Sequence, residues 1–157
     1  TDSDIQSNLE AGGIGRSGRV RVDARAVFLF TNPNSERAAQ IQTLVRQAQN
    51  GNPAGVGDAG NVTINAPATV RILGRNASGK ISAIFSTINN GVVGEGGNVT
   101  INTRSLHVRH GGSVNADNFG TGAAGTIQIN TRGIWLDNDG VITARSRSGL
   151  GGDIFLN

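Results

Sequence analysis

The chain has 157 residues, enough for one domain; Gly contributes 24 of them, and only 36% are hydrophobic. Cys is absent, which excludes disulfide bonds and thiolate metal sites, and no apolar run is long enough for a membrane-spanning helix. The net charge of +3 is too small to indicate a nucleic-acid partner by itself. These values predict a Gly-punctuated β protein rather than an enzyme with a deep, rigid core.

The beginning of the chain shows no targeting segment. Thr1 to Asp4 are polar and acidic, so we expect no secretory signal peptide within this chain. Because the whole sequence lacks Met, we expect it to be a piece of a longer product.

One phrase recurs five times along the chain and sets the period of the fold. It consists of a small residue, Gly, a polar residue and a short apolar strand, as in Gly96-Gly-Asn-Val-Thr-Ile-Asn102. Its first β-branched residues are Val20, Val62, Val99, Ile127 and Ile154. The last two spacings, 28 and 27 residues, give one basic circuit, or coil, whereas the first two, 42 and 37 residues, include insertions.

Each coil contains three runs in which apolar and polar residues alternate, the pattern of half-buried strands. The runs lie at 62–64, 70–72 and 81–83, then at 99–101, 106–108 and 114–116, then at 127–129, 134–136 and 142–144. This pattern predicts a right-handed parallel β-helix over 1–157, with Ala83, Ala116 and Ala144 in one narrow corner. An antiparallel sandwich is the alternative, but it does not explain a side-chain register of about 27 residues.

Residues 34–50 interrupt the strand pattern. Apolar side chains at 38, 41, 44, 45 and 48 have the spacing of one helical stripe. Asn34 or Ser35 can cap the start, and Gly51 stands where a helix would end. The segment therefore predicts an inserted amphipathic α-helix that covers the end of the stack or packs on its flank.

The repeats resemble those of filamentous-haemagglutinin-like exoproteins of two-partner secretion, of the cyanobacterial type. The resemblance rests on residues 96–102, 111–116 and 118–125; it covers 59–157 well and 11–30 less closely. It implies a rod-like passenger, secreted or on the cell surface, with an outer-membrane secretion partner for the parent protein. Asn32-Pro-Asn34 matches only part of the phrase that marks the secretion domain, so we expect a piece of the repeat shaft alone.

Two rows of side chains are the candidate functional features. After the first strand of each coil stand Asp23 and then Asn65, Asn102, Asn130 and Asn157, which predict a structural ladder of stacked amides. On the outer face of the second strand the tentative ligand-binding residues are Phe28, Arg71, His107 and Trp135, with Arg25, Arg104 and Arg132 just before that strand. Aromatic rings between Arg side chains can stack sugars or bind a polyanion. Packing of these side chains on one another and on the predicted helix is the alternative.

No arrangement of catalytic or metal-ligating residues stands out. Glycoside hydrolysis needs converging carboxylates, whereas the close acidic pair within the repeats, Asp137 and Asp139, lies in an ordinary tight turn that could bind Ca²⁺ only weakly. His107 and His110 point to different sides and lack a third ligand. We therefore expect no enzyme activity, no cofactor, no metal and no nucleic-acid partner.

The sequence favours a non-enzymatic structural or adhesive shaft segment of a secreted or cell-surface exoprotein. The alternative is a self-assembling subunit, because the strand edge before Asn157 could accept Val20–Asp23 of another copy and form filaments. A weaker alternative is a carbohydrate-binding module that takes surface glycans on Trp135 and its neighbours.

Overall fold

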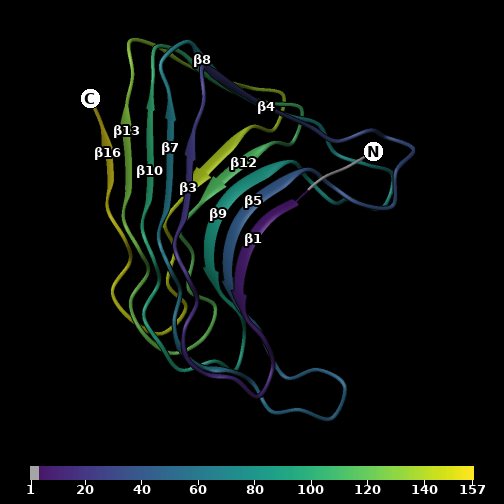
Figure 1. Ribbon diagram of the computed structural model, residues 1–157, viewed down its shortest axis with the longest axis vertical. Coiled ribbons are helices and arrows are strands. Elements are labelled where there is room, and N and C mark those ends of the chain that lie inside the picture. Colours follow the sequence, from purple (N-terminus) through teal and green to yellow (C-terminus); the bar gives the residue numbers. More distant parts are fainter. Residues whose placement is uncertain (1–3) are drawn as a thin grey trace.

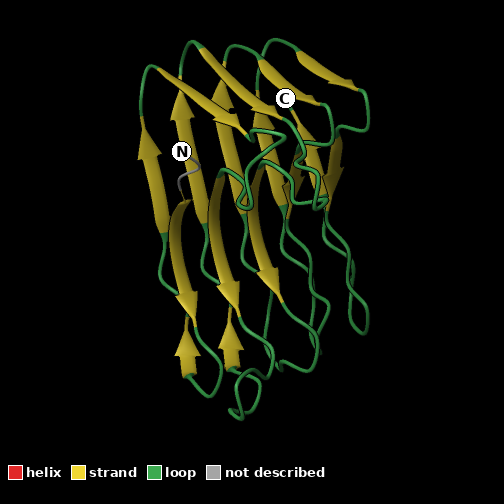
Figure 2. Cartoon of the chain, turned by 90° about the vertical axis from the view of Figure 1, so that its right-hand side faces the viewer, coloured by secondary structure: helices red, strands yellow, loops and turns green. Residues whose placement is uncertain are grey.

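The computed structural model describes residues 4–157, which form sixteen strands and no helix (Figures 1 and 2). Sheet I contains β1 (Asp4–Leu9), β5 (Gln40–Val45), β9 (Ala83–Ile88), β12 (Ser113–Asn115) and β15 (Val141–Thr143). Sheet II contains β3 (Val20–Asp23), β7 (Val62–Ala66), β10 (Val99–Thr103), β13 (Ile127–Asn130) and β16 (Ile154–Leu156). Sheet III contains β4 (Ala26–Phe30), β8 (Thr69–Leu73), β11 (Leu106–Arg109) and β14 (Ile134–Asp137), and sheet IV pairs β2 (Ile14–Arg16) with β6 (Val56–Asp58).

The sheets are those of a parallel β-solenoid. Every neighbouring pair of named strands is parallel, and the partners come from successive coils of the chain. In sheet II the register joins Val20, Val62, Val99, Ile127 and Ile154 in one row, which confirms the period read from the sequence. Figure 1 shows the coils offset from one another, with the strands of sheet II side by side at the left.

The main core is an apolar column inside the coils, and a second, smaller cluster contains Val45, Ala59, Ile88 and Val92. Alternate residues of sheet II point inward, so that Val62, Ile64, Val99 and Ile101 have no exposed surface. They pack with inward residues of the other two large sheets into one cluster. Complete burial of such a side chain contributes roughly 1.5–3 kcal/mol. Since one coil has no partner for its apolar side, stacking supplies most of the stability.

The predicted helix at 34–50 is wrong. Residues 40–45 form β5, which lies between β1 and β9 in sheet I and pairs with both. Ile41 and Val45 point into the core and are almost fully buried, while Leu44 lies on the opposite face of the strand. A helix here would leave two strand edges without backbone partners. The pairing on both sides outweighs the helical spacing of the apolar residues.

Two further details of sheet I differ from the sequence prediction. The third strand of the second predicted coil begins at Ala83 instead of 81, because an insertion with a bridge between Arg75 and Ile81 precedes it. Ala83 consequently pairs with Ser113, so it does not share the row of Ala116 and Ala144. In sheet I, β1 was not predicted, and neither β2 nor β6 of sheet IV was; β1 and β2 add part of a coil before β3. Within residues 4–157 there is no helix long and apolar enough to cross a membrane.

Candidate functional site

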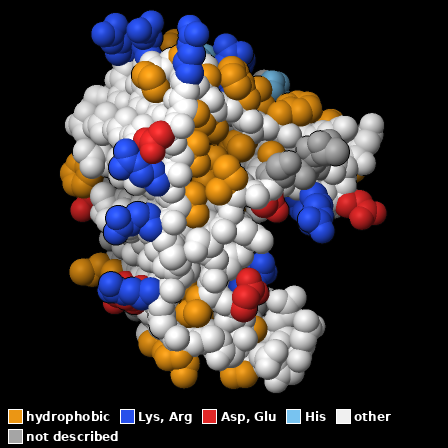
Figure 3. All heavy atoms as spheres, viewed as in Figure 1, with side chains coloured by type: hydrophobic (Ala, Val, Ile, Leu, Met, Phe, Trp, Pro, Cys, Tyr) orange, Lys and Arg blue, Asp and Glu red, His pale blue; other side chains and the backbone are white. Residues whose placement is uncertain are grey.

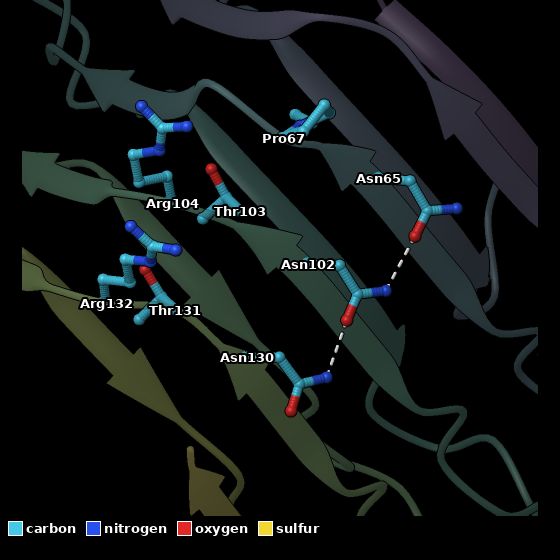
Figure 4. Close-up of a pocket in the computed structure, with 9 residues that line it drawn as sticks. Asn65, Pro67, Asn102, Thr103, Arg104, Asn130, Thr131 and Arg132 are labelled. Atoms are coloured by element: carbon cyan, nitrogen blue, oxygen red, sulfur yellow. Dashed lines mark hydrogen bonds between the residues drawn. The ribbon is translucent and has the colours of Figure 1, made fainter.

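A ladder of side-chain amides runs along the C-terminal ends of the strands in sheet II. Asn65 donates its amide N–H to a carboxylate oxygen of Asp23 at 2.6 Å, and Asn102 donates to Asn65 at 2.7 Å. Asn130 continues the chain to Asn102 at 2.6 Å, and Asn157 donates to Asn130 at 3.0 Å. The predicted ladder is thus present, and every amide points its donor toward the N-terminal coil (Figure 4).

The row on the outer face of sheet III lies in register as the sequence suggested. Phe28, Arg71, His107 and Trp135 occupy equivalent positions on its four strands. The rings of His107 and Trp135 stack with centroids 4.5 Å apart and planes inclined by 5°, and the Arg71 guanidinium lies 5.8 Å from the centre of Phe28. The row therefore consists of two stacked pairs, while Trp135 keeps half of its surface exposed.

The stacked imidazole is electrostatically perturbed. Partial burial is the main cause that lowers the pKa of His107 below its ordinary value, and the positive charges of Arg71 and Arg109 add to it. Asp137 acts in the opposite direction but is weaker. The neutral imidazole is consequently favoured beside Trp135.

An open trough lies at the corner where the chain passes from sheet II to sheet III. It has a volume of about 470 Å³. We call it the corner trough. It is lined by Asn65, Ala66, Pro67, Asn102, Thr103, Arg104, Asn130, Thr131 and Arg132. Figure 4 shows the amide ladder on one side of it and the parallel side chains of Arg104 and Arg132 on the other.

Hydroxyl groups hold the shape of this corner. Thr103 donates to the carbonyl of Ser105 at 3.2 Å, and Thr131 donates to the carbonyl of Gly133 at 3.1 Å. These local bonds compete with strand backbone pairing and favour a bend at the end of each strand. In the coil before them, Pro67 fixes the bend with its ring.

The corner trough carries positive charge without a balancing carboxylate. Its lining contains two guanidinium groups and no Asp or Glu. Within residues 4–157, no carboxylate lies within 4.0 Å of the side-chain nitrogens of Arg104 or Arg132, while five other Arg residues form ion pairs. Figure 3 shows basic side chains projecting from the upper edge of the molecule, where the strands of sheet II end, with no acidic side chain visible among them.

The indole of Trp135 lies against the chain that leaves the corner trough toward sheet III. A Cβ atom placed on Gly133 would lie 2.7 Å from the benzo ring of Trp135, so the indole covers the backbone directly after Arg132. The absence of a side chain at Gly133 makes room for this ring. An Arg pair, an amide ladder and an exposed indole thus adjoin one another.

An ion pair and the backbone geometry account for the acidic tight turn between β14 and β15. Asp137 accepts a 2.6 Å hydrogen bond from Arg109, and this contact lowers the pKa of its carboxyl group. Asn138 and Asp139 both have positive φ, at 43° and 63°, as the tight turn requires. Across the part of the chain that the structure describes, no three His, Asp or Glu side chains are placed to hold a metal ion.

The structure brings together only some of the residues singled out in the sequence. Arg104 and Arg132 line the corner trough with three members of the ladder, and Trp135 adjoins it. Arg25 stands before β4 but is not part of the lining, and Phe28 and Arg71 lie farther along the row in sheet III. Pro67, Thr103 and Thr131 were not predicted as part of the site. Thr103 and Thr131 directly follow the ladder Asn of their coils, and this repeated Asn-Thr pair was the available signal, whereas Pro67 stands two residues after Asn65.

Comparison with known proteins gave no match to a protein-family model, to a curated protein or to a solved structure.

Proposed function

We propose that the chain is a shaft segment of a secreted or cell-surface exoprotein, built as a right-handed parallel β-helix, and that it acts through the repeated faces of its coils. The observation that carries the proposal is the unbroken register of sheets I and II, each with five parallel strands from successive coils. A register of this kind makes the molecule extendable in one direction.

Two physical arguments support a shaft. Each coil of a solenoid contacts mainly its neighbours, so length can increase coil by coil without redesign of the core. Connections between parallel strands of one sheet are right-handed in nearly all proteins, which supports the proposed hand. The resemblance of residues 59–157 to exoprotein repeats supplies the proposed location outside the cell.

The side-chain chemistry supports a non-covalent role. Asp58 is paired with Arg16 at 2.9 Å, and the backbone N–H of Glu95 is the main cause of its lowered pKa. Asp117 is almost fully buried and pairs with Arg145 at 3.0 Å. These carboxylates are engaged in holding neighbouring coils together, so we assign the chain no enzymatic step and no cofactor.

Cell-surface accessibility tests the proposal. Antibodies raised against the purified chain are applied to intact and to lysed cells of the organism that produces it, with a cytosolic enzyme as the leakage control. A surface shaft predicts labelling of intact cells, or antigen in the medium, and loss of the surface signal after protease treatment. Antigen found only after lysis would overturn the proposal.

A further inference from the structure

We propose that the corner trough, together with the exposed face of Trp135, binds a linear polysaccharide that carries anionic groups. The inference deepens the adhesive part of the proposed function and rests on it. The carrying observation is a pair of guanidinium groups without carboxylate partners, on two neighbouring coils, beside the row of amides, with an exposed indole three residues after Arg132.

The charge arrangement calls for an anion. Arg104 and Arg132 stand on neighbouring coils, joined by a 3.1 Å hydrogen bond between their backbones, and their side chains run parallel (Figure 4). Like charges on adjacent strands repel each other when no counter-charge lies between them. A carboxylate or sulfate group seated between the two would accept charge-assisted hydrogen bonds from both.

The amide ladder adds neutral recognition next to the charge. Each interior Asn uses one amide hydrogen and one lone pair of its oxygen within the ladder, which leaves a second N–H and a second lone pair. Hydroxyl groups both donate and accept, so a sugar can satisfy either group. The amides recur at the strand spacing of ~4.8 Å, with the two Arg residues on adjacent coils beside them, and such a regular row of hydrogen-bonding groups fits a regular polymer better than the irregular surface of a protein.

Trp135 supplies the apolar contact that sugars need. One face of its indole stacks on His107, half of its surface remains exposed, and its benzo ring lies against Gly133, the residue after Arg132. An open aromatic face packs against the C–H surface of a pyranose ring. The stack on His107 holds the ring in place before binding, which reduces the entropy lost on association.

Calorimetric titration with defined polymers tests the inference. The probes are polygalacturonate, a sulfated dextran, unmodified dextran and a single-stranded oligonucleotide. We expect binding to at least one anionic polysaccharide, no binding to unmodified dextran, weaker binding at high salt, and a change in Trp135 fluorescence. Equal or stronger binding of the oligonucleotide, or no binding of either anionic polysaccharide, would overturn the inference.

A charge-matched pair of variants locates the site. R104Q/R132Q removes the trough charges, whereas R19Q/R37Q removes two exposed charges elsewhere. The first should weaken binding by at least about tenfold, because two charge-assisted contacts are lost, and it should retain or raise Tm because repulsion is relieved. The second should bind like the parent. Equal effects of both variants would overturn the site. If no polymer binds although the chain is found on the cell surface, this inference fails and the shaft role stands.

Discussion

At the scale of single residues, the amide ladder makes a graded contribution to stability. Asn102 donates one ladder bond and accepts another, whereas Asn157 at the end has only the bond that it donates to Asn130. N102A should therefore lower the free energy of unfolding by about 1–3 kcal/mol, and N157A by less than half of that loss. Urea denaturation of both variants measures the difference, and equal losses would contradict a contribution that grows with the number of ladder bonds.

The stacked pair in sheet III predicts a pH response. Because the folded-state pKa of His107 is lowered, the unfolded chain binds more protons at mildly acidic pH. This contribution to stability is complete above the ordinary His pKa of ~6.5 and decreases as the pH falls through the window between that value and the lower folded pKa.

Trp135 fluorescence reports this titration directly, since a protonated imidazole stacked at 4.5 Å quenches the indole. As the pH is lowered, the Trp135 emission should decrease, with a midpoint at a pH below ~6.5. R71Q removes one of the charges that lower the pKa, so its midpoint should move to higher pH, whereas R19Q should leave it in place. An R71Q midpoint equal to that of the parent chain would contradict this electrostatic account.

At the scale of elements, the Gly of the repeated phrase is required by the approach of neighbouring coils. A Cβ on Gly97 would overlap the carbonyl oxygen of Gly60 in the coil before it, and Gly125 stands in the same relation to Gly97. The phrase thus repeats its Gly because the backbones meet at the corner before sheet II. This is packing, and no ligand is needed to explain it.

G97A should lower the free energy of unfolding by about 1–3 kcal/mol, because the backbone of two coils must separate. G151A is the matched control within the same kind of phrase. The nearest atom to a Cβ at Gly151 is the oxygen of Ala144, at an ordinary 3.9 Å, so the control should lose little or gain slightly. Thermal unfolding of the two variants under the same conditions measures the difference. A similar loss of stability in both would contradict the steric explanation.

The elements also show what the sequence could and could not predict. Rows such as Val20 to Ile154 follow from local alternation and a repeated phrase, and the structure confirms them. The strand at Ile41–Val45 was missed because its apolar residues fit both a helical stripe and an alternating strand. Only the open edges of β1 and β9 decide between these, and they belong to other coils.

The corner trough was partly predictable for the same reason. Arg104 and Arg132 were singled out from their positions before the second strand, and the ladder from its regular Asn. That the two rows border one open space depends on how sharply the chain bends at Thr103 and Thr131. The bend angle is a property of the stacked coils, so no single repeat encodes it.

At the scale of the whole molecule, the two ends of the described solenoid do not match each other. Each coil visits sheet I first, then sheets II and III; β1 begins in sheet I and β16 ends in sheet II. If β1 of a second copy docked on β15 and its β3 on β16, sheet III would lack a strand between β14 and the next β4. Head-to-tail stacking would thus leave a gap in the wall and expose the core.

The polarity of the ladder opposes the same contact. Every Asn of the ladder donates to the coil before its own. The amide oxygen of Asn157 is therefore the group that would face a following coil. A second copy would place Asp23 there, whose carboxylate can only accept and already bonds Arg21 and Asn65. Two acceptors would face each other without a proton between them, which costs the hydration of both groups.

We therefore predict that the 157-residue chain does not form the uniform filaments that end-to-end stacking would give. Sedimentation velocity over a concentration series should show a particle of 16.1 kDa as the regular species. The exposed apolar side chains at the C-terminal end, among them Leu156 and Val141, can still cause irregular aggregates at high concentration. Electron microscopy distinguishes these from ordered rods. Unbranched rods of constant width would contradict both mismatches at once, because they require sheet III to close and the ladder to continue across the junction.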